Sequence, residues 1–515
     1  MPSSLTRRDL LSTAAAAGLA AGAPGLARAA AGPQGQLTWG VHVSMAPTWF
    51  DPAETSGIVT PFMVMYALHD AMVKPMPGNP VAPSLAESYK AAEDGLSYDF
   101  VLRENATFHN GDPVTAEDVK FSFERYRGTS AKLMHDRVAA IETPDPRHVT
   151  IRLKAPWLDF LTFYSSATGA GWVVPKKYVE KVGDEGFKKA PVGAGPYKFV
   201  RFTPGVQLEL EAYEPYWRKT PSVKRLVLRS IPEETTRLAA LKQGDIDILY
   251  WITGQLAEDL RQSKGLTLKA AIVQTPFWVY FPDQWDPKSP WHDVRVRRAA
   301  SLAIDRKSIN EALTLGYSKL TNSLIPESFE YYAPQPAPEY DVAKAKALLA
   351  QAGHPGGIDA GNFYCDAAFS MIAEAVLNGF TEAGIRATLQ PIERAGFFRS
   401  YAGKQYKGLI MGASGAFGNA ATRLEAFVVK GGSYAYGSDP EIDALFVQQG
   451  TEMDRGKRGA LLKQIQDLVT EKAIYAPIWQ LAALNGTGPR VGESGFGLIP
   501  GDPWSSPYED LTLKA

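Results

Sequence analysis

The chain has 515 residues, more than one hydrophobic core usually serves, so we expect two or more lobes. Lysine and arginine (54) nearly balance aspartate and glutamate (55), and the net charge of −1 gives no sustained field for nucleic acid or anionic lipid. We therefore expect no nucleic-acid partner. The single cysteine, Cys365, cannot form an internal disulfide, and the seven histidines lack ligand spacing. The sequence predicts neither a metal site nor a cofactor.

The first thirty residues differ in kind from the rest. Thr6–Leu11 contains two adjacent arginines, an Ala/Gly/Leu run follows, and Ala27–Ala29 offers small residues for cleavage. This order is typical of a twin-arginine export signal, so we exclude residues 1–29 from the fold. The alternative, an N-terminal core helix, is disfavoured by Pro24 and the glycines around it. The sequence predicts export by the twin-arginine machinery to the periplasm.

Helix and strand signals alternate after the signal, which favours a mixed α/β fold. Capping residues, terminal glycines and alternating polarity define the clearest elements. We predict, in chain order, a helix over 116–127, a helix over 233–243 that ends at Gly244, a strand over 245–250, helices capped by Asp293 and Asp341 that end at 304 and 352, a helix over 372–383 and a strand over 408–412. Prolines between 326 and 338 predict an extended surface connection.

Several motifs along the chain match one known family in order. Residues 83–89, 95–103 and 106–122 closely resemble the signature of the dipeptide/oligopeptide/nickel-binding family of ABC-importer receptors, family 5. Further matches follow at 193–199, 213–217, 241–247, 294–306 and 340–349. One motif residue, His109, is expected to be a structural histidine rather than a ligand.

The resemblance implies a periplasmic-binding-protein type II-like, two-lobed α/β fold with an additional inserted subdomain. Lobe I would comprise residues 36–68, 190–272 and 479–515, the inserted subdomain 69–189, and lobe II 273–478. A small-molecule ligand would lie between the lobes, and their closure would be recognised by the membrane permease of an ABC importer. No chemistry on the ligand is implied, and we expect a monomer.

The pocket positions depart from the dipeptide-binding members, which hold a zwitterion with an arginine and an aspartate of lobe II. By alignment, Phe363 beside Tyr364 replaces the arginine, and the loop Ala413–Asn419 has no aspartate. Enclosed ammonium and carboxylate groups lose hydration worth several kcal/mol each, so a plain zwitterionic dipeptide is disfavoured. Rings and backbone amides suit an aromatic, conjugated or monoanionic ligand.

The candidate ligand-binding residues are aromatic or polar side chains at positions where family members line the pocket, namely Trp49, Phe50, Trp251, Trp278, Tyr280, Phe363, Tyr364, Ser414, Phe417, Asn419 and Arg423. Arg423 could bind one carboxylate bidentately, or it could be an ordinary charge on a helix surface. Any of the aromatic residues could instead belong to a core.

Three other functions stay open alongside this one. An oligopeptide receptor, or a receptor for a metal, metallophore or haem, would use the same scaffold. A sensor or chaperone role would not depend on transport. A periplasmic enzyme is disfavoured because Gly412–Ala416 fails the nucleophile-elbow pattern at its last position, and the sequence contains no His-Glu-x-x-His motif. We therefore expect no catalytic residue.

Overall fold

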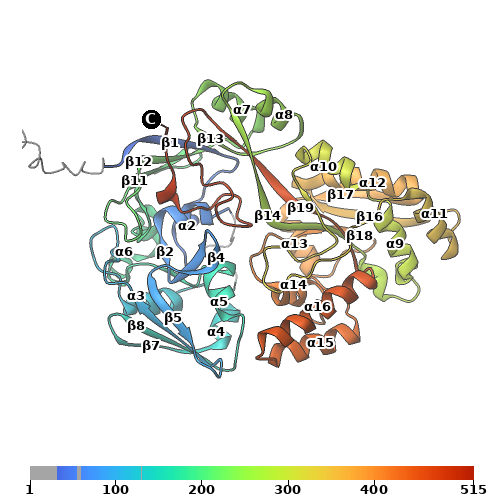
Figure 1. Ribbon diagram of the computed structural model, residues 1–515, viewed down its shortest axis with the longest axis horizontal. Helices are drawn as coiled ribbons and strands as arrows, with labels where there is room; N and C mark the ends of the chain where they lie inside the picture. The colour runs from blue at the N-terminus through green and yellow to red at the C-terminus, as the bar shows by residue number, and fades with distance from the viewer. Residues whose placement is uncertain (1–31, 55–59, 129, 515) are drawn as a thin grey trace, which may run out of the picture.

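The computed structural model describes residues 32–54, 60–128 and 130–514. The predicted export signal, residues 1–29, lies outside the described residues. Figure 1 shows two lobes joined by the long strands β14 (Thr267–Tyr280) and β19 (Tyr475–Thr487). Within the described ranges, no helix is both long enough and apolar enough to cross a membrane.

Each part of the molecule mixes helices and strands. Lobe I contains β1 (Gln34–Val41), α2 (Phe62–Leu68), β10 (Tyr197–Thr203), β11 (Gln207–Ala212), β12 (Val223–Ser230), α7 (Glu234–Gln243), β13 (Ile248–Ile252) and α8 (Gly254–Gln262). The inserted subdomain contains β2 (Asp70–Ala71), β3 (Val73–Met76), β4 (Asn79–Pro83), β5 (Ala86–Ala91), β6 (Ser97–Leu102), α3 (Ala116–Glu124), α4 (Ala131–Arg137), β7 (Val138–Asp145), β8 (His148–Leu153), α5 (Phe160–Thr162), β9 (Trp172–Val173) and α6 (Lys176–Lys189). Lobe II contains α9 (Val294–Leu302), α10 (Arg306–Thr314), β15 (Lys319–Leu320), α11 (Val342–Gln351), β16 (Ile358–Asp366), α12 (Ser370–Ala383), β17 (Ile385–Ile392), α13 (Arg394–Ala402), β18 (Leu409–Ala413), α14 (Ala420–Phe427), α15 (Pro440–Thr451) and α16 (Arg455–Glu471).

One sheet runs through both lobes. Its strand order is β10-β11-β12-β1-β13-β19-β14-β18-β16-β17, with β15 paired to β19. β14 and β19 pair antiparallel from Thr267 opposite Thr487 to Tyr280 opposite Tyr475, and the register shifts between Ile272 and Pro276. The shift is a local break in the ladder where the strands pass from lobe I to lobe II. A hinge between the lobes would use this segment.

The hydrophobic cores lie within the lobes. One core, in lobe I, combines residues of β1 and β10 to β13 with residues of the C-terminal segment, and it includes Trp39, Tyr250 and Tyr508. A separate core under the four-stranded sheet β5-β6-β8-β7 contains Phe100 and Tyr164. Lobe II has one core on α9 and α12 and another on α14 and α16. Because each part has its own core, closing movements between them do not disrupt their packing.

Helix caps form where the sequence predicts them. The Asp293 and Asp341 carboxylates accept the backbone N–H of Arg295 and of Lys344, each at 2.8 Å. The helix predicted over 116–127 ends three residues earlier, at Glu124. The strand predicted over 245–250 covers Ile248–Ile252 instead, because Asp247 is held in the preceding bend by Thr38, whose N–H it accepts at 2.9 Å. The connection over 326–338 contains no helix or strand, as predicted.

The structural role predicted for His109 is confirmed. Gly193 N–H donates to its Nδ1 at 3.3 Å, so Nε2 carries the proton that is donated to the Gly195 carbonyl at 2.9 Å. Both glycines pack against the end of α2, and a Cβ built on Gly193 would lie 1.9 Å from the Leu68 carbonyl oxygen. A residue with a Cβ would collide with the backbone at positions 193 and 195, which explains why the motif has glycine at both.

Candidate functional site

Parallel strands of the two lobes direct their carboxyl ends toward each other. In lobe I, β1 pairs in parallel with β12 and β13, and β13 ends at Ile252 opposite Leu484 of β19. In lobe II, β16 pairs in parallel with β17 and β18, and β18 ends at Ala413 opposite Phe277 of β14. Leu484 pairs with Ala270 of β14. The two edges therefore lie about seven residues apart along β14, from Ala270 to Phe277, a distance of roughly 23 Å. Ligands of open α/β sheets bind outside such carboxyl ends.

Three rings gather at the carboxyl edge of lobe I, and we call them the aromatic cluster: His42 after β1, Trp251 in β13, and Trp504 near the C-terminus. The His42 ring centre lies 4.7 Å from that of Trp504 and 6.2 Å from that of Trp251, and the two indoles are 5.9 Å apart. Trp251 has a positive φ of 61°. A bulky residue rarely adopts this conformation, and such strain concentrates at binding sites.

Neighbouring groups hold Trp251 in this conformation. Its N–H donates to the Asn485 side-chain oxygen at 3.1 Å, and its carbonyl accepts from the Arg237 guanidinium at 2.5 Å. Trp504 is placed by Asp502, whose Oδ1 accepts the N–H of Trp504 at 3.1 Å and of Ser505 at 2.8 Å. The aromatic cluster is therefore fixed by hydrogen bonds from the surrounding backbone and side chains.

The aromatic cluster is uncharged near neutral pH. Burial, and then the nearby Arg237 charge, lowers the pKa of His42 to about 4, so its imidazole is neutral. His42 Nδ1 and Trp504 Nε1 are buried and make no hydrogen bond within the described part of the chain. Buried polar atoms normally have partners, so these two atoms are exceptions within the aromatic cluster. The cluster suits a planar group with hydrogen-bonding atoms at its edge.

A loop of lobe II, residues 414–419, connects β18 to α14 at the opposite edge. Ser414 is partly exposed, and its hydroxyl accepts the Ala416 N–H at 3.4 Å. Asn419 caps α14 by accepting the Thr422 N–H at 3.1 Å. Ser414, Phe417 and Asn419 lie in this uncharged loop; Phe417 and Asn419 are buried, and Ser414 is the partly exposed residue of the three.

Arg423, on the first turn of α14, lies inside lobe II with 3% of its surface exposed, so the alternative of an ordinary surface charge is wrong. Its guanidinium donates to the carbonyls of Ala416 at 2.9 Å and Leu324 at 3.3 Å, and lies 5.3 Å from the ring centre of Phe329. Burial lowers the pKa of Arg423 to about 9. Arg423 therefore stabilises the loop 414–419 through its bond to the Ala416 carbonyl.

The remaining candidates lie elsewhere in the fold. Phe50, Trp278, Tyr280 and Phe363 have no more than 1% of their surface exposed and belong to the cores of their lobes. Trp49 packs on the core of lobe I, and Tyr364 stacks on Tyr406 with ring centres 4.2 Å apart. Protein neighbours already cover the surfaces of the four core residues, while Trp49 and Tyr364 are half-buried and pack against other aromatic or core residues.

Sequence reasoning missed His42 and Trp504. His42 directly follows the apolar end of β1, and this position next to a predicted carboxyl edge was the available signal. Trp504 lies 253 residues from Trp251, and only the fold of the C-terminal segment brings them together. Among the described residues, no three His, Cys, Asp or Glu side chains are grouped so that they could hold a metal ion.

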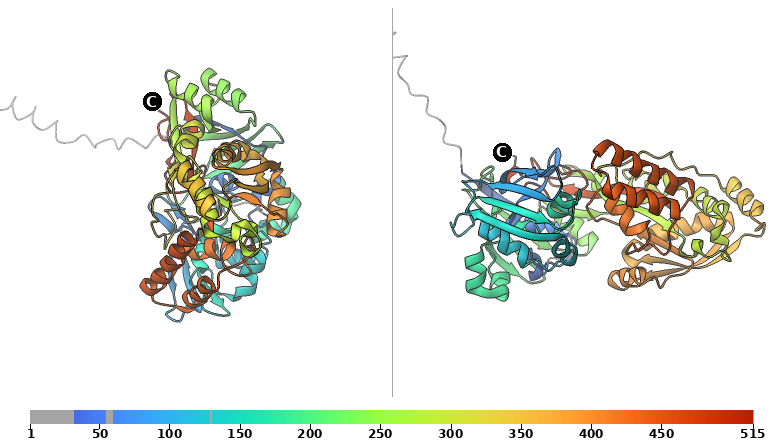
Figure 2. Two further views of the ribbon diagram at one scale, coloured as in Figure 1. Left: turned by 90° about the vertical axis from the view of Figure 1, so that its right-hand side faces the viewer. Right: turned by 90° about the horizontal axis from the view of Figure 1, so that it is seen from below.

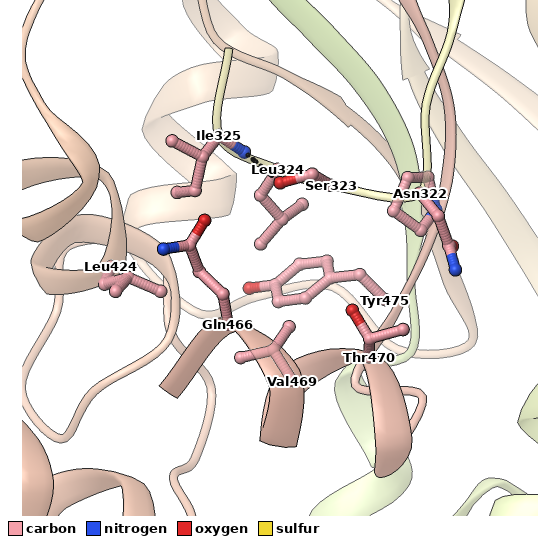
Figure 3. A pocket seen from close by; sticks show the side chains of 10 residues that line it. Asn322, Ser323, Leu324, Ile325, Leu424, Gln466, Val469, Thr470 and Tyr475 are labelled. Atoms are coloured by element: carbon pink, nitrogen blue, oxygen red, sulfur yellow. Dashed lines mark hydrogen bonds between the residues drawn. The ribbon is translucent and has the colours of Figure 1, made fainter. Parts of the chain in front are cut away.

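A cavity inside lobe II is too small for a ligand. It measures about 20 Å³, the size of one water, and lies between Leu324, Leu424, Val469 and Tyr475 (Figure 3). Gln466 points into the same region, and its amide donates to the Tyr331 carbonyl at 2.9 Å and accepts the Ala333 N–H at 3.0 Å. These contacts fix the side chain, so the cavity belongs to the core behind Arg423.

Comparison with known proteins identifies the family of the chain. Heme-binding protein A of Haemophilus influenzae is 27% identical over 460 residues, 80% of this chain and 81% of the relative. Probable di/tripeptide-binding protein 5 of Pseudomonas aeruginosa is 26% identical over 486 residues, 87% of this chain and 90% of the relative. The crystal structure of the ABC transporter substrate binding protein CtaP from Listeria monocytogenes has the same fold, with a TM-score of 0.80 and 20% identity over 94% of this chain and 100% of that one. Residues 80–435 match the family model "Bacterial extracellular solute-binding proteins, family 5 Middle". The chain therefore belongs to family 5 of the bacterial extracellular solute-binding proteins, which are receptors of ABC importers rather than enzymes.

Proposed function

We propose that this receptor binds a small ligand with a planar, largely uncharged portion, and delivers it to the membrane permease of an ABC importer. The observation that carries the proposal is the aromatic cluster of His42, Trp251 and Trp504 at the carboxyl edge of lobe I. The planar portion would lie against these rings, and the loop 414–419 of lobe II would cover it on closure.

The charges near both edges argue against a plain zwitterionic dipeptide. His42 is neutral, and the loop 414–419 contains no charged residue. The buried arginines beside the two edges, Arg237 in lobe I and Arg423 in lobe II, already donate to backbone carbonyls. A buried ammonium or carboxylate without an ionic partner costs several kcal/mol, so a ligand with both charges would bind weakly there. A monoanionic ligand would have to keep its carboxylate in water.

A haem or metallophore is the second candidate ligand. A relative at 27% identity is named as a heme-binding protein, and His42 Nδ1 is buried without a partner among the described residues. A neutral imidazole is an iron ligand in haem proteins, and here the His42 ring would have to turn to bring its covered Nδ1 to the iron. An oligopeptide held through its backbone is the third, supported by the relative named for di- and tripeptides.

We also propose the export route and the organisation of the chain. Residues 1–29 would act as a twin-arginine signal that places the receptor in the periplasm as a monomer. The lobe boundaries proposed are 36–68, 190–272 and 479–515 for lobe I, 69–189 for the inserted subdomain and 273–478 for lobe II. Support comes from the paired arginines Arg7 and Arg8 and from the separate hydrophobic cores.

The test is a thermal-shift screen of the exported chain against di- and tripeptides, aromatic acids, opine-like conjugates, glycosides and haemin. A ligand at a hundred times its Kd should stabilise the protein by about 2.7 kcal/mol. The same screen with Trp504→Leu should lose the shift, whereas the exposed Tyr340→Leu should retain it. If zwitterionic dipeptides alone stabilise the protein, and Trp504→Leu binds them equally well, the proposal is wrong. A Soret band that appears with haemin and is lost in His42→Ala would select the second candidate.

A further inference from the structure

A single carboxylate of the inserted subdomain bonds to two side chains of lobe II. Asp159, the residue before α5, accepts hydrogen bonds from Asn419 Nδ2 at 2.5 Å and from an Arg458 guanidinium nitrogen at 2.8 Å. Asn419 begins α14 and Arg458 lies in α16, so two separate elements of lobe II meet at one side chain of the subdomain. Figure 1 shows α5 opposite α14, and the view from below in Figure 2 shows the same approach.

A second contact lies close by. A Cβ built on Gly95 of the subdomain would lie 3.3 Å from Cε of Met453, which precedes α16. The two parts of the molecule are therefore in van der Waals contact beside the polar contact.

The Asp159–Arg458 pair is largely shielded from water. The exposed fraction of the side chain is 4% for Arg458 and 14% for Asp159. The Arg458 Nε donates to the Gln449 side chain at 2.9 Å, and its guanidinium lies 5.3 Å from the ring centre of Tyr331. Burial by itself would lower the pKa of Arg458, but its bonds to Asp159 raise it above the ordinary value. Charge-assisted bonds in such surroundings are stronger than those at an exposed surface.

The contact also reaches the loop 414–419. Asn419 uses its amide nitrogen for Asp159 and its amide oxygen for the Thr422 N–H, while Thr422 Oγ1 accepts the Asn419 N–H at 3.0 Å. The side chain that closes the loop is thus the side chain that meets the subdomain. Moving the subdomain away would remove one of the bonds that orient it.

We infer that Asp159 is a positioning residue. It holds the inserted subdomain against lobe II by protein contacts alone, and through Asn419 it orients the loop 414–419 for ligand binding. Neither partner of Asp159 belongs to the aromatic cluster, so the contact does not depend on which ligand is bound. The ligand then has to supply only part of the free energy of closure. The inference stands apart from the ligand class proposed above.

The experiment measures the shape of the ligand-free exported chain. Its radius of gyration from small-angle X-ray scattering should equal the value calculated from this structure. Asp159→Asn and Arg458→Gln should each lower the closed-to-open ratio by about tenfold or more and so increase the radius of gyration. The double variant should match either single variant, because both remove the same interaction. Glu142→Gln, which breaks the exposed pair with Arg152 inside the subdomain, is the matched control and should change nothing.

Melting curves of all variants show that the lobes stay folded. The inference is overturned if the wild-type radius of gyration already exceeds the calculated value, if the two single variants scatter like the wild type, or if their effects simply add. None of these outcomes depends on the ligand, so failure here leaves the thermal-shift screen for the proposed function intact.

Discussion

Asp502 carries a buried carboxyl beneath the aromatic cluster, and its replacement by asparagine should stabilise the protein at neutral and higher pH. Asp502 is 2% exposed, and burial raises its pKa from 3.8 to about 7. In the unfolded chain the group ionises near pH 3.8, whereas in the folded protein it keeps its proton until about pH 7. Its contribution to stability is therefore complete below pH 3.8 and is lost as the pH rises to 7.

A pKa difference of about 3 units corresponds to about 4 kcal/mol, because one unit is worth about 1.4 kcal/mol. An asparagine side chain at this position keeps the oxygen that accepts the N–H groups of Trp504 and Ser505, and it never ionises. We expect Asp502→Asn to be more stable than the wild type by about 4 kcal/mol at pH 8 and by only about 1 kcal/mol at pH 4.5.

Thermal melting at the two pH values measures this difference, and at pH 8 the Tm of the variant should be higher by at least about 4 °C. Asp359→Asn is the matched control, since Asp359 accepts a backbone N–H, that of Gly361 at 2.9 Å, at an exposed site. An equal effect of Asp502→Asn at both pH values, or a loss of stability at pH 8, would refute the reasoning.

Close packing and burial lead to three further predictions. Gly193→Ala should destabilise the chain by about 3 kcal/mol in urea unfolding, because its Cβ would lie 1.9 Å from the Leu68 carbonyl oxygen; an unchanged midpoint would contradict this. Cys365 should resist iodoacetamide at pH 8 in the native protein and react fully in urea, as mass spectrometry would show, because burial raises its pKa to about 11; rapid native labelling would contradict this. Arg423→Met should lower the free energy of unfolding by at least about 2 kcal/mol, because two buried carbonyls lose their donor. If Arg423→Met instead melts like the wild type and changes only the binding of anionic compounds, the residue faces the ligand.

Sequence patterns predicted most of the local structure because helix ends have local causes. Asp293 and Asp341 act on N–H groups two or three residues away, and Gly244 ends α7 with a φ of 80°. The start of β13 was misplaced because its cause is distant: Asp247 accepts an N–H from Thr38, 209 residues earlier. The two-lobed fold followed from the motifs, and the structural likeness to solved receptors confirms it.

The candidate site was harder to predict from the sequence because it is assembled from separate strands. Alignment to family positions selected Phe363, Trp278 and Tyr280, which lie inside lobe II. Position within a strand decides whether an aromatic side chain faces a core or an edge, and the sequence alone does not give the register. The pairing of β14 with β18 and β19 locates the candidate site instead, because it shows which strand ends face each other across the two lobes. His42 and Trp251 lie at the strand ends of lobe I.

The two halves of the candidate site are held in different ways. In lobe I, Asn485 and Asp502 fix the rings through bonds within the same lobe, so the aromatic cluster keeps its shape whether the lobes are open or closed. In lobe II, the loop 414–419 ends at Asn419, which bonds across to Asp159 of the inserted subdomain. The geometry of this loop is therefore tied to closure, while that of the cluster is not. A ligand contacts the rings and the loop together only in the closed arrangement, so contact with both halves distinguishes the loaded receptor from its open forms.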